Sequence, residues 1–249
     1  MSKQHKQRQP LRKALVITSF LLFPITFKYF SPGIIITGAA RGIINGSFMV
    51  FVLLFILALF LGRAWCSWAC PGAGIEELAM TISAKPARGG KLNWIKWGIW
   101  IIWLGVIARF AIAAGGYHTV DFFLLTDGGV SLSQVPLDYI IYYIVLGLFF
   151  LLPLIAGKRA TCHYFCWIAP FMILARKIGN LFKWPVLGLH VEPDKCIDCK
   201  RCSSECQMSL DVAQMVQAGK LEHSECILCG QCVDSCPKNV LRYTFSSTP

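Results

Sequence analysis

Apolar residues along the chain form four long stretches separated by shorter polar segments. A helix that crosses roughly 30 Å of hydrocarbon needs about 20 residues. We therefore predict membrane-spanning helices near residues 11–29, 43–61, 94–114 and 137–156. The first stretch contains Pro24 and Lys28, which a span tolerates when the lysine reaches toward the interface. Two mixed segments, near residues 75–85 and 171–183, have apolar residues at helical spacing and basic ends, which is typical of helices lying on a membrane surface.

The pattern changes near residue 190, where the chain becomes polar and rich in cysteine. We therefore predict two domains, a membrane domain over residues 1–189 and a small soluble domain over residues 190–249. The expected fold class is mainly α, with a four-helix membrane anchor preceding the soluble domain. Composition supports the bilayer as solvent, since 55% of the residues are hydrophobic and only 15% are charged.

Positive charge is concentrated between particular spans. Lysine and arginine together number 24, against 13 acidic residues, and most of them lie before the first span, between the second and third, and after the fourth. Lysine and arginine accumulate in cytoplasmic loops of membrane proteins, so this distribution places both termini and the soluble domain in the cytoplasm. The same bias accounts for the basic composition, and we expect membrane lipid and no nucleic acid as a partner.

Eight of the twelve cysteines form two runs, each with the spacing C-x2-C-x2-C-x3-C, and Pro237 follows the second run. The spacing is typical of [4Fe-4S] clusters, and in two-cluster ferredoxins the fourth cysteine of each run binds the other cluster. By that rule the two expected ligand sets are Cys196, Cys199, Cys202 and Cys236 for cluster 1, and Cys206, Cys226, Cys229 and Cys232 for cluster 2. The alternative is a pair of zinc sites, which more often use separated C-x2-C pairs. Gln207 stands where the first run would have its proline, which we expect to change local packing more than ligation.

The other four cysteines belong to a weak internal repeat. A C-x3-C pair follows the second span and another follows the fourth, as Cys66 with Cys70 and Cys162 with Cys166. Four thiols meeting at one place are suited to a further metal, a redox-active disulfide or an electron relay. The alternative is that they pack as small apolar residues, and their duplication favours a redox or metal role.

A few other polar groups are candidates for a quinone site. Arg109 lies inside the third predicted span, with His118 and Asp121 after it, so it is placed either to pair with Asp121 or to bind a quinone head group. An arginine extending to the interface is the alternative. His163, between Cys162 and Cys166, is a candidate ligand or proton relay, although an ordinary interfacial histidine explains it as well.

With these motifs the chain resembles the membrane-bound polyferredoxin family that includes NapH, the C-terminal half of NosR and the CcoG-type proteins, and it is most similar to the NapH type. The resemblance rests on Cys66 to Pro71, on Cys162 to Cys166 and on the two cluster runs. It implies four spans, paired C-x3-C-P motifs, a prokaryotic cytoplasmic membrane, and electron transfer linked to quinol or to a cytoplasmic donor. The second motif departs from the pattern, because Trp167 replaces the proline.

These observations lead to two functional hypotheses. The first is an iron–sulfur electron-transfer protein, such as a quinol dehydrogenase subunit, that connects the quinone pool or a cytoplasmic donor with redox partner proteins. The second is a metal-handling factor of the CcoG type that binds or reduces copper through Cys66, Cys70, Cys162 and Cys166, since soft thiolates suit Cu(I). The sequence leaves the direction of electron flow open.

Overall fold

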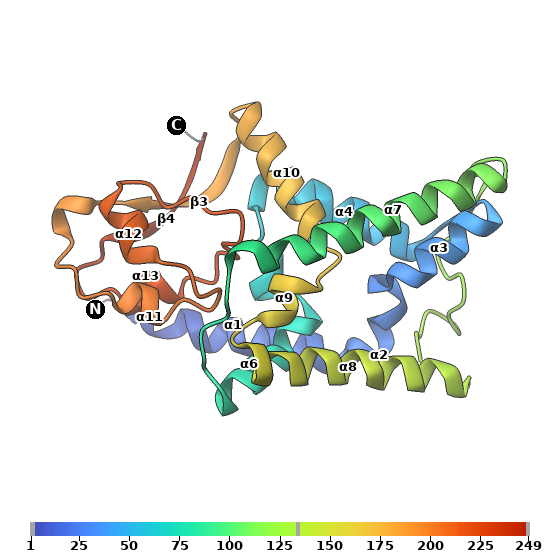
Figure 1. The fold of residues 1–249 in the computed structure, drawn as a ribbon, viewed down its shortest axis with the longest axis horizontal. Coiled ribbons are helices and arrows are strands. Elements are labelled where there is room, and N and C mark those ends of the chain that lie inside the picture. The colour runs from blue at the N-terminus through green and yellow to red at the C-terminus, as the bar shows by residue number, and fades with distance from the viewer. Residues whose placement is uncertain (1–2, 133–134, 248–249) are drawn as a thin grey trace.

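The computed structural model describes residues 3–132 and 135–247, and most of these residues are helical. Long helices extend from the middle of the molecule toward one end, and loops, short helices and two strands form a domain at the other end (Figure 1). The N-terminal helix starts beneath that domain, far in sequence from the residues that surround it. The arrangement agrees with the predicted mainly-α fold.

Two helices in the described part of the chain are long and apolar enough to cross a membrane, residues 90–113 and residues 136–156. The first combines the short η2 (Gly90–Trp94) with α7 (Ile95–Ala113), and the second is α8 (Pro136–Ala156). They correspond to the predicted third and fourth spans. The second predicted span is α4 (Gly46–Leu61), which is apolar but has 16 residues. The four-span anchor therefore stays a prediction beyond these two helices.

The first predicted span, residues 11–29, is not one straight helix. It is divided among α1 (Lys3–Leu21), α2 (Phe23–Thr26) and the 3-10 helix η1 (Phe27–Phe30), with a bend of 56° at the break. Pro24 lies in the first turn of α2 and has no N–H with which to continue the hydrogen bonding of α1. Lys28 is buried, and its Nζ donates to Asp138, in the first turn of α8, at 2.7 Å.

A small structure closes the end of the molecule far from the soluble domain. There α3 (Pro32–Arg41) ends at Gly42, and the parallel strands β1 (Ile43–Asn45) and β2 (Thr119–Asp121) pair in register. Gly42 has a φ of 65°, and a side chain there would overlap the ring of His118. His118 thus packs against the turn that returns the chain into α4.

Two similar pairs of helices follow α4 and α8. The first pair is α5 (Trp65–Trp68) with α6 (Pro71–Ile82), and the second is α9 (Ala160–Tyr164) with α10 (Ala169–Leu181). The predicted helices near 75–85 and 171–183 correspond to α6 and α10, and their position on a membrane surface stays a prediction. α6 packs between α1 and α8, and α10 packs against α4 and α7.

The soluble domain is framed by two antiparallel strands, β3 (Pro185–Val191) and β4 (Leu241–Ser247). Between them lie η3 (Pro193–Lys195), α11 (Arg201–Ser204), α12 (Val212–Gln217) and α13 (Gln231–Ser235). Strand β3 crosses the boundary predicted between residues 189 and 190, because it pairs with β4 from Pro185 onward. The strand that frames the domain therefore begins at Pro185, before the cysteine-rich sequence starts.

Candidate functional site

Four cysteines of the soluble domain line one small cavity: Cys196, Cys199, Cys202 and Cys236. Cys196 and Cys199 lie on a loop that Asp198 and Lys200 turn tightly, since both have left-handed backbone conformations, and Cys202 lies in α11 directly after it. The fourth lies at the end of α13. Cys199 is exposed, so this group of thiols lies near the surface of the soluble domain.

A second group of cysteines is buried on the side of the soluble domain that faces the helices. Cys232 interacts electrostatically with Cys206, Cys226 and Cys229, so these four thiols are neighbours. Burial raises the pKa of Cys226 to about 12. A thiol in such surroundings keeps its proton until a metal displaces it. Cys232 also interacts electrostatically with Cys202 of the first group, so the two groups lie close to each other. The assignment of the two groups as the ligand sets of two clusters stays a prediction.

All twelve cysteines are free, including the eight in these two groups. Each group supplies the four thiols that one cubane takes, because each thiolate ligates a different iron. In the described ranges, no group of three or more His, Cys, Asp or Glu side chains is arranged to hold a metal ion.

A buried ion-pair network connects the membrane helices to the loop of the second group. Glu225 accepts hydrogen bonds from Arg63 at 2.8 Å and from Lys96 at 2.5 Å, and Arg63 also donates to the carbonyl of Ser224. Burial opposes ionisation of Glu225, but the two cations outweigh it and bring its pKa to about 2. The sequence shows Arg63 and Lys96 only as part of the positive charge near the second and third predicted spans. In the structure both pair with Glu225 on the loop that carries Cys226.

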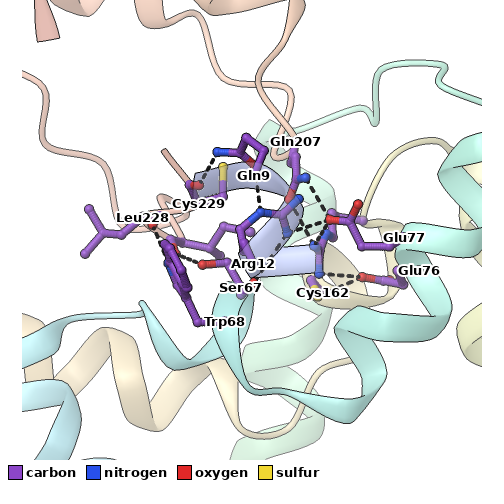
Figure 2. A network of polar contacts seen from close by, with 12 residues as sticks. Gln9, Arg12, Ser67, Trp68, Glu76, Glu77, Cys162, Gln207, Leu228 and Cys229 are labelled. Carbon is purple, nitrogen blue, oxygen red and sulfur yellow. Dashed lines mark hydrogen bonds and ion pairs between the residues drawn. The ribbon is translucent and has the colours of Figure 1, made fainter. Parts of the chain in front are cut away.

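A second buried network lies on the other side of the same interface (Figure 2). Glu77 accepts from Arg12 at 2.6 Å, from Arg159 at 2.9 Å and from Gln207 at 2.8 Å, and Arg159 also donates to Gln207. Arg12 and Arg159 are completely buried. Burial opposes ionisation of Glu77, yet the arginines hold its pKa below the ordinary value. The network joins α1, α6, the start of α9 and the soluble domain.

Gln207 therefore has a role that the ligand motif does not indicate. It occupies the position where ferredoxin-type runs have proline, and its amide contacts both Arg159 and Glu77. A proline there has no side-chain polar group, so both charged partners would lose a hydrogen bond. The departure from the motif was visible in the sequence, together with an acidic pair at Glu76 and Glu77 inside an apolar segment, but their contact was not.

The thiols of the two C-x3-C pairs lie together at the start of the two helix pairs. Cys66 and Cys162 are buried on α5 and α9, while Cys70 and Cys166 immediately precede or lie close to the starts of α6 and α10. Each thiol interacts electrostatically with at least two of the others. The internal repeat seen in the sequence is thus a repeat in space.

All four thiols line one cavity of about 580 Å³. Its other walls are mostly aromatic and aliphatic, contributed by α2, η1, α3 and α8, and they include Phe23, Phe27, Phe149 and Trp167. Arg63 also lines this cavity, and its buried Nε has no hydrogen-bond partner. The cavity is therefore an apolar space with thiols and one cation in its wall.

The other candidate residues lie elsewhere. Arg109 is exposed on α7 and does not line the thiol cavity, and no ion pair joins it to Asp121 in the described ranges. His163 is buried, with Nδ1 at 3.0 Å from Asn93 Oδ1 and Nε2 at 3.1 Å from the carbonyl of Met208, and burial lowers its pKa to about 4. A neutral histidine with both ring nitrogens engaged positions the segment after Cys206.

Comparison with known proteins identifies two matched regions in the chain. Residues 46–85 match a family model described as a 4Fe-4S binding domain, and residues 195–241 match a 4Fe-4S dicluster domain. The second region contains all eight cysteines of the two soluble groups. The chain thus carries iron–sulfur binding domains of the ferredoxin type, which supports clusters over zinc.

Several proteins resemble the chain along most of its length. An uncharacterized protein of Methanocaldococcus jannaschii is 26% identical over 91% of this chain and 91% of its own length. The ferredoxin-type protein MauN of Methylorubrum extorquens, named for methylamine utilization, is 22% identical over 90% and 76%. YccM of Escherichia coli, whose name provisionally assigns it to electron transport, is 24% identical over 82% of this chain and 57% of its own length. No solved structure matches the chain.

Proposed function

We propose that this protein carries electrons between quinones in a prokaryotic cytoplasmic membrane and a soluble redox partner, using two [4Fe-4S] clusters bound by its C-terminal domain. Its likeness to ferredoxin-type proteins and to YccM supports an electron-transport role. One observation carries the connection to the membrane. The Cys226–Cys229 loop rests directly on α5, where Ser67 Oγ donates to the carbonyl of Ile227 at 2.7 Å.

Contacts with the helices support an order of the two ligand groups. Trp68 Nε1 donates to the carbonyl of Leu228, and His163 contacts Met208, so both C-x3-C segments contact the loops that carry the proposed cluster 2 cysteines. The proposed cluster 1 cysteines include the exposed Cys199. In this proposal cluster 2 faces the membrane helices, and cluster 1 faces the soluble partner.

The thiol cavity is suited to a quinone. Its aromatic and aliphatic walls match an isoprenoid chain and a planar ring, and the free Nε of Arg63 is a donor for a quinone oxygen. Arg63 also bonds the loop before Cys226, so the same guanidinium touches the cavity and the cluster domain. Arg109, the alternative anchor, lies outside this cavity.

The stoichiometry of the reaction is balanced. Oxidation of one quinol to quinone releases two electrons and two protons, and two one-electron clusters accept the two electrons between them, while the protons leave to water. The reverse direction, with electrons from a soluble donor reducing a quinone, uses the same sites. The basic loops favour a topology with both termini and the clusters in the cytoplasm.

The test is anaerobic reduction of the full chain in proteoliposomes by menaquinol, followed by EPR of the clusters. Val145 on α8 is half-buried and lines the cavity, whereas Ile144 on the same helix is exposed and does not. We expect Val145→Trp to slow cluster reduction at least tenfold because it fills the cavity, and Ile144→Trp to leave the rate unchanged. Clusters that dithionite reduces but menaquinol does not, in the unmodified protein, would contradict the proposal.

A further inference from the structure

We infer that Cys66, Cys70, Cys162 and Cys166 are the ligands of a third iron–sulfur cluster, a cubane held at the junction of the two helix pairs. The inference deepens the electron-transfer function proposed above by assigning the thiols in the cavity wall. It rests on the grouping of the thiols, on the donors around them and on their likeness to the two groups in the soluble domain.

The thiol number and placement meet the requirement for a cubane, which takes four thiolates on four irons. Two thiols come from each half of the repeat, and all four line one cavity. The match to a 4Fe-4S binding domain at residues 46–85 includes only Cys66 and Cys70 among the cysteines. A cluster bound by that region needs two further ligands, and the fold brings Cys162 and Cys166 to it.

The backbone around two of the sulfurs is arranged for thiolates. The amides of Gly72 and Ala73, in the first turn of α6, lie close to the Cys70 thiol, and those of Ile168 and Ala169, at the start of α10, lie close to the Cys166 thiol. N–H groups at helix starts favour negative charge, and hydrogen bonds to ligating sulfur tune a cluster. The pattern is the same in both halves although the second half lacks the proline after its second cysteine.

Gly72 shows how closely the segment is packed. A side chain at Gly72 would overlap the ring of Phe149 on α8. Glycine therefore lets α6 start against α8, which keeps the amide of Gly72 close to Cys70. The thiol group is built by close backbone approach and not by loose loops.

Charged groups of both signs surround the thiols. The Arg63 guanidinium interacts electrostatically with Cys66 and Cys162, and Arg159 interacts with the same two thiols. The buried carboxylate of Glu76 accepts a hydrogen bond from the Cys162 sulfur at 3.1 Å. The two buried arginines would offset part of the negative charge of a cluster with four thiolate ligands.

The experiment compares iron and acid-labile sulfide in the anaerobically purified full chain. We expect about twelve irons and twelve sulfides per chain, four for each cubane. The variants C66S/C70S and C162S/C166S should each fall to about eight, because one cluster needs both pairs, while the EPR signals of the soluble clusters remain. Met172→Leu is the matched control, since Met172 contacts the Cys66 sulfur but is no thiolate, and it should keep twelve.

Eight irons in the unmodified protein, with or without bound copper, would overturn the inference even if the serine variants failed to fold. Two variants that retain twelve irons would overturn it as well. The result is separable from the proposed function. Eight irons with menaquinol-dependent reduction would remove the third cluster alone, and twelve irons without that reduction would remove the quinone reaction alone.

Discussion

The two C-x3-C segments are similar in shape and different in what they hold. Each follows a long helix and a glycine with positive φ, Gly62 or Gly157, and each leads through a short helix into a longer one. The first segment contacts the Cys226–Cys229 loop through Ser67 and Trp68. The second contacts the segment that follows Cys206 through neutral side chains and Arg159.

The difference shows how a repeated unit serves two tasks. The thiols occupy corresponding places in both segments, whereas the surrounding residues are specialised to grip opposite sides of the same cluster group. The thiols of the two segments are arranged alike, whereas the residues that contact the cluster loops differ between the segments. Substitutions of the residues that contact the cluster loops should therefore change the stability of the protein to different extents in the two halves.

The largest effect is expected from Glu225→Ala on the first side. The substitution leaves Arg63 and Lys96 buried without their carboxylate, at a cost of about 3–5 kcal/mol. Thermal unfolding in detergent, followed by loss of cluster absorbance, measures it. Glu205→Ala, an exposed acidic residue in the same domain, is the control and should lie within about 0.5 kcal/mol of the unmodified protein. Equal stability of the two variants would show that the ion pairs do not dock the domain.

Gln207→Leu tests the second side with a smaller expected effect. The apolar side chain keeps the volume but removes hydrogen bonds to Arg159 and Glu77, which costs about 1–3 kcal/mol. The same unfolding experiment measures it. Because both charged residues still contact each other, we expect folded protein with both soluble clusters. An unchanged unfolding midpoint would mean that the second segment docks through other contacts.

Ser67→Ala should have a modest effect, about 0.5–1.5 kcal/mol, because one buried hydrogen bond to the carbonyl of Ile227 is lost. It also sharpens the electron-transfer proposal, since it loosens the contact between α5 and the cluster loop without touching a ligand. We expect slower menaquinol-dependent reduction and an unchanged iron content. A loss of iron would instead place Ser67 among the determinants of cluster binding.

Lys195→Ala should have the smallest effect. Lys195 pairs with Glu192 on the surface, where such pairs contribute about 0–1 kcal/mol. Its unfolding midpoint should match that of the unmodified protein within error. A large change would show that surface charge, and not the buried networks, controls the stability of the soluble domain.

The sequence predicted features that depend on neighbouring residues but not those that depend on contacts between distant residues. Residues 94–114 and 137–156 were recognisable from continuous hydrophobicity, and the cysteine runs from their spacing. The bend before Phe23 was not predicted, because a proline such as Pro24 can also lie within one continuous span. The boundary at β3 was missed because the partner strand lies more than fifty residues later, around Leu241.

The candidate site shows the same limit. Arg63 and Lys96 fit the charge bias of cytoplasmic loops equally well as free or paired residues, so nothing in the pattern revealed Glu225 as their partner. Arg109 drew attention because it lies inside a span, whereas the cation in the cavity wall is Arg63 at the end of α4. Long-range contacts decide which charge has which role, and one sequence does not contain that information.

The position of α1 has a consequence for biogenesis. Its Arg8 pairs with Asp234, and its Gln9 donates to the carbonyl of Cys229, near the other end of the polypeptide. α1 packs mainly on α6, which is synthesised soon after it, but the contacts of Arg8 and Gln9 form only when residues more than two hundred positions later have been made. The start of the chain is therefore fixed in place only after the cluster-binding domain has folded.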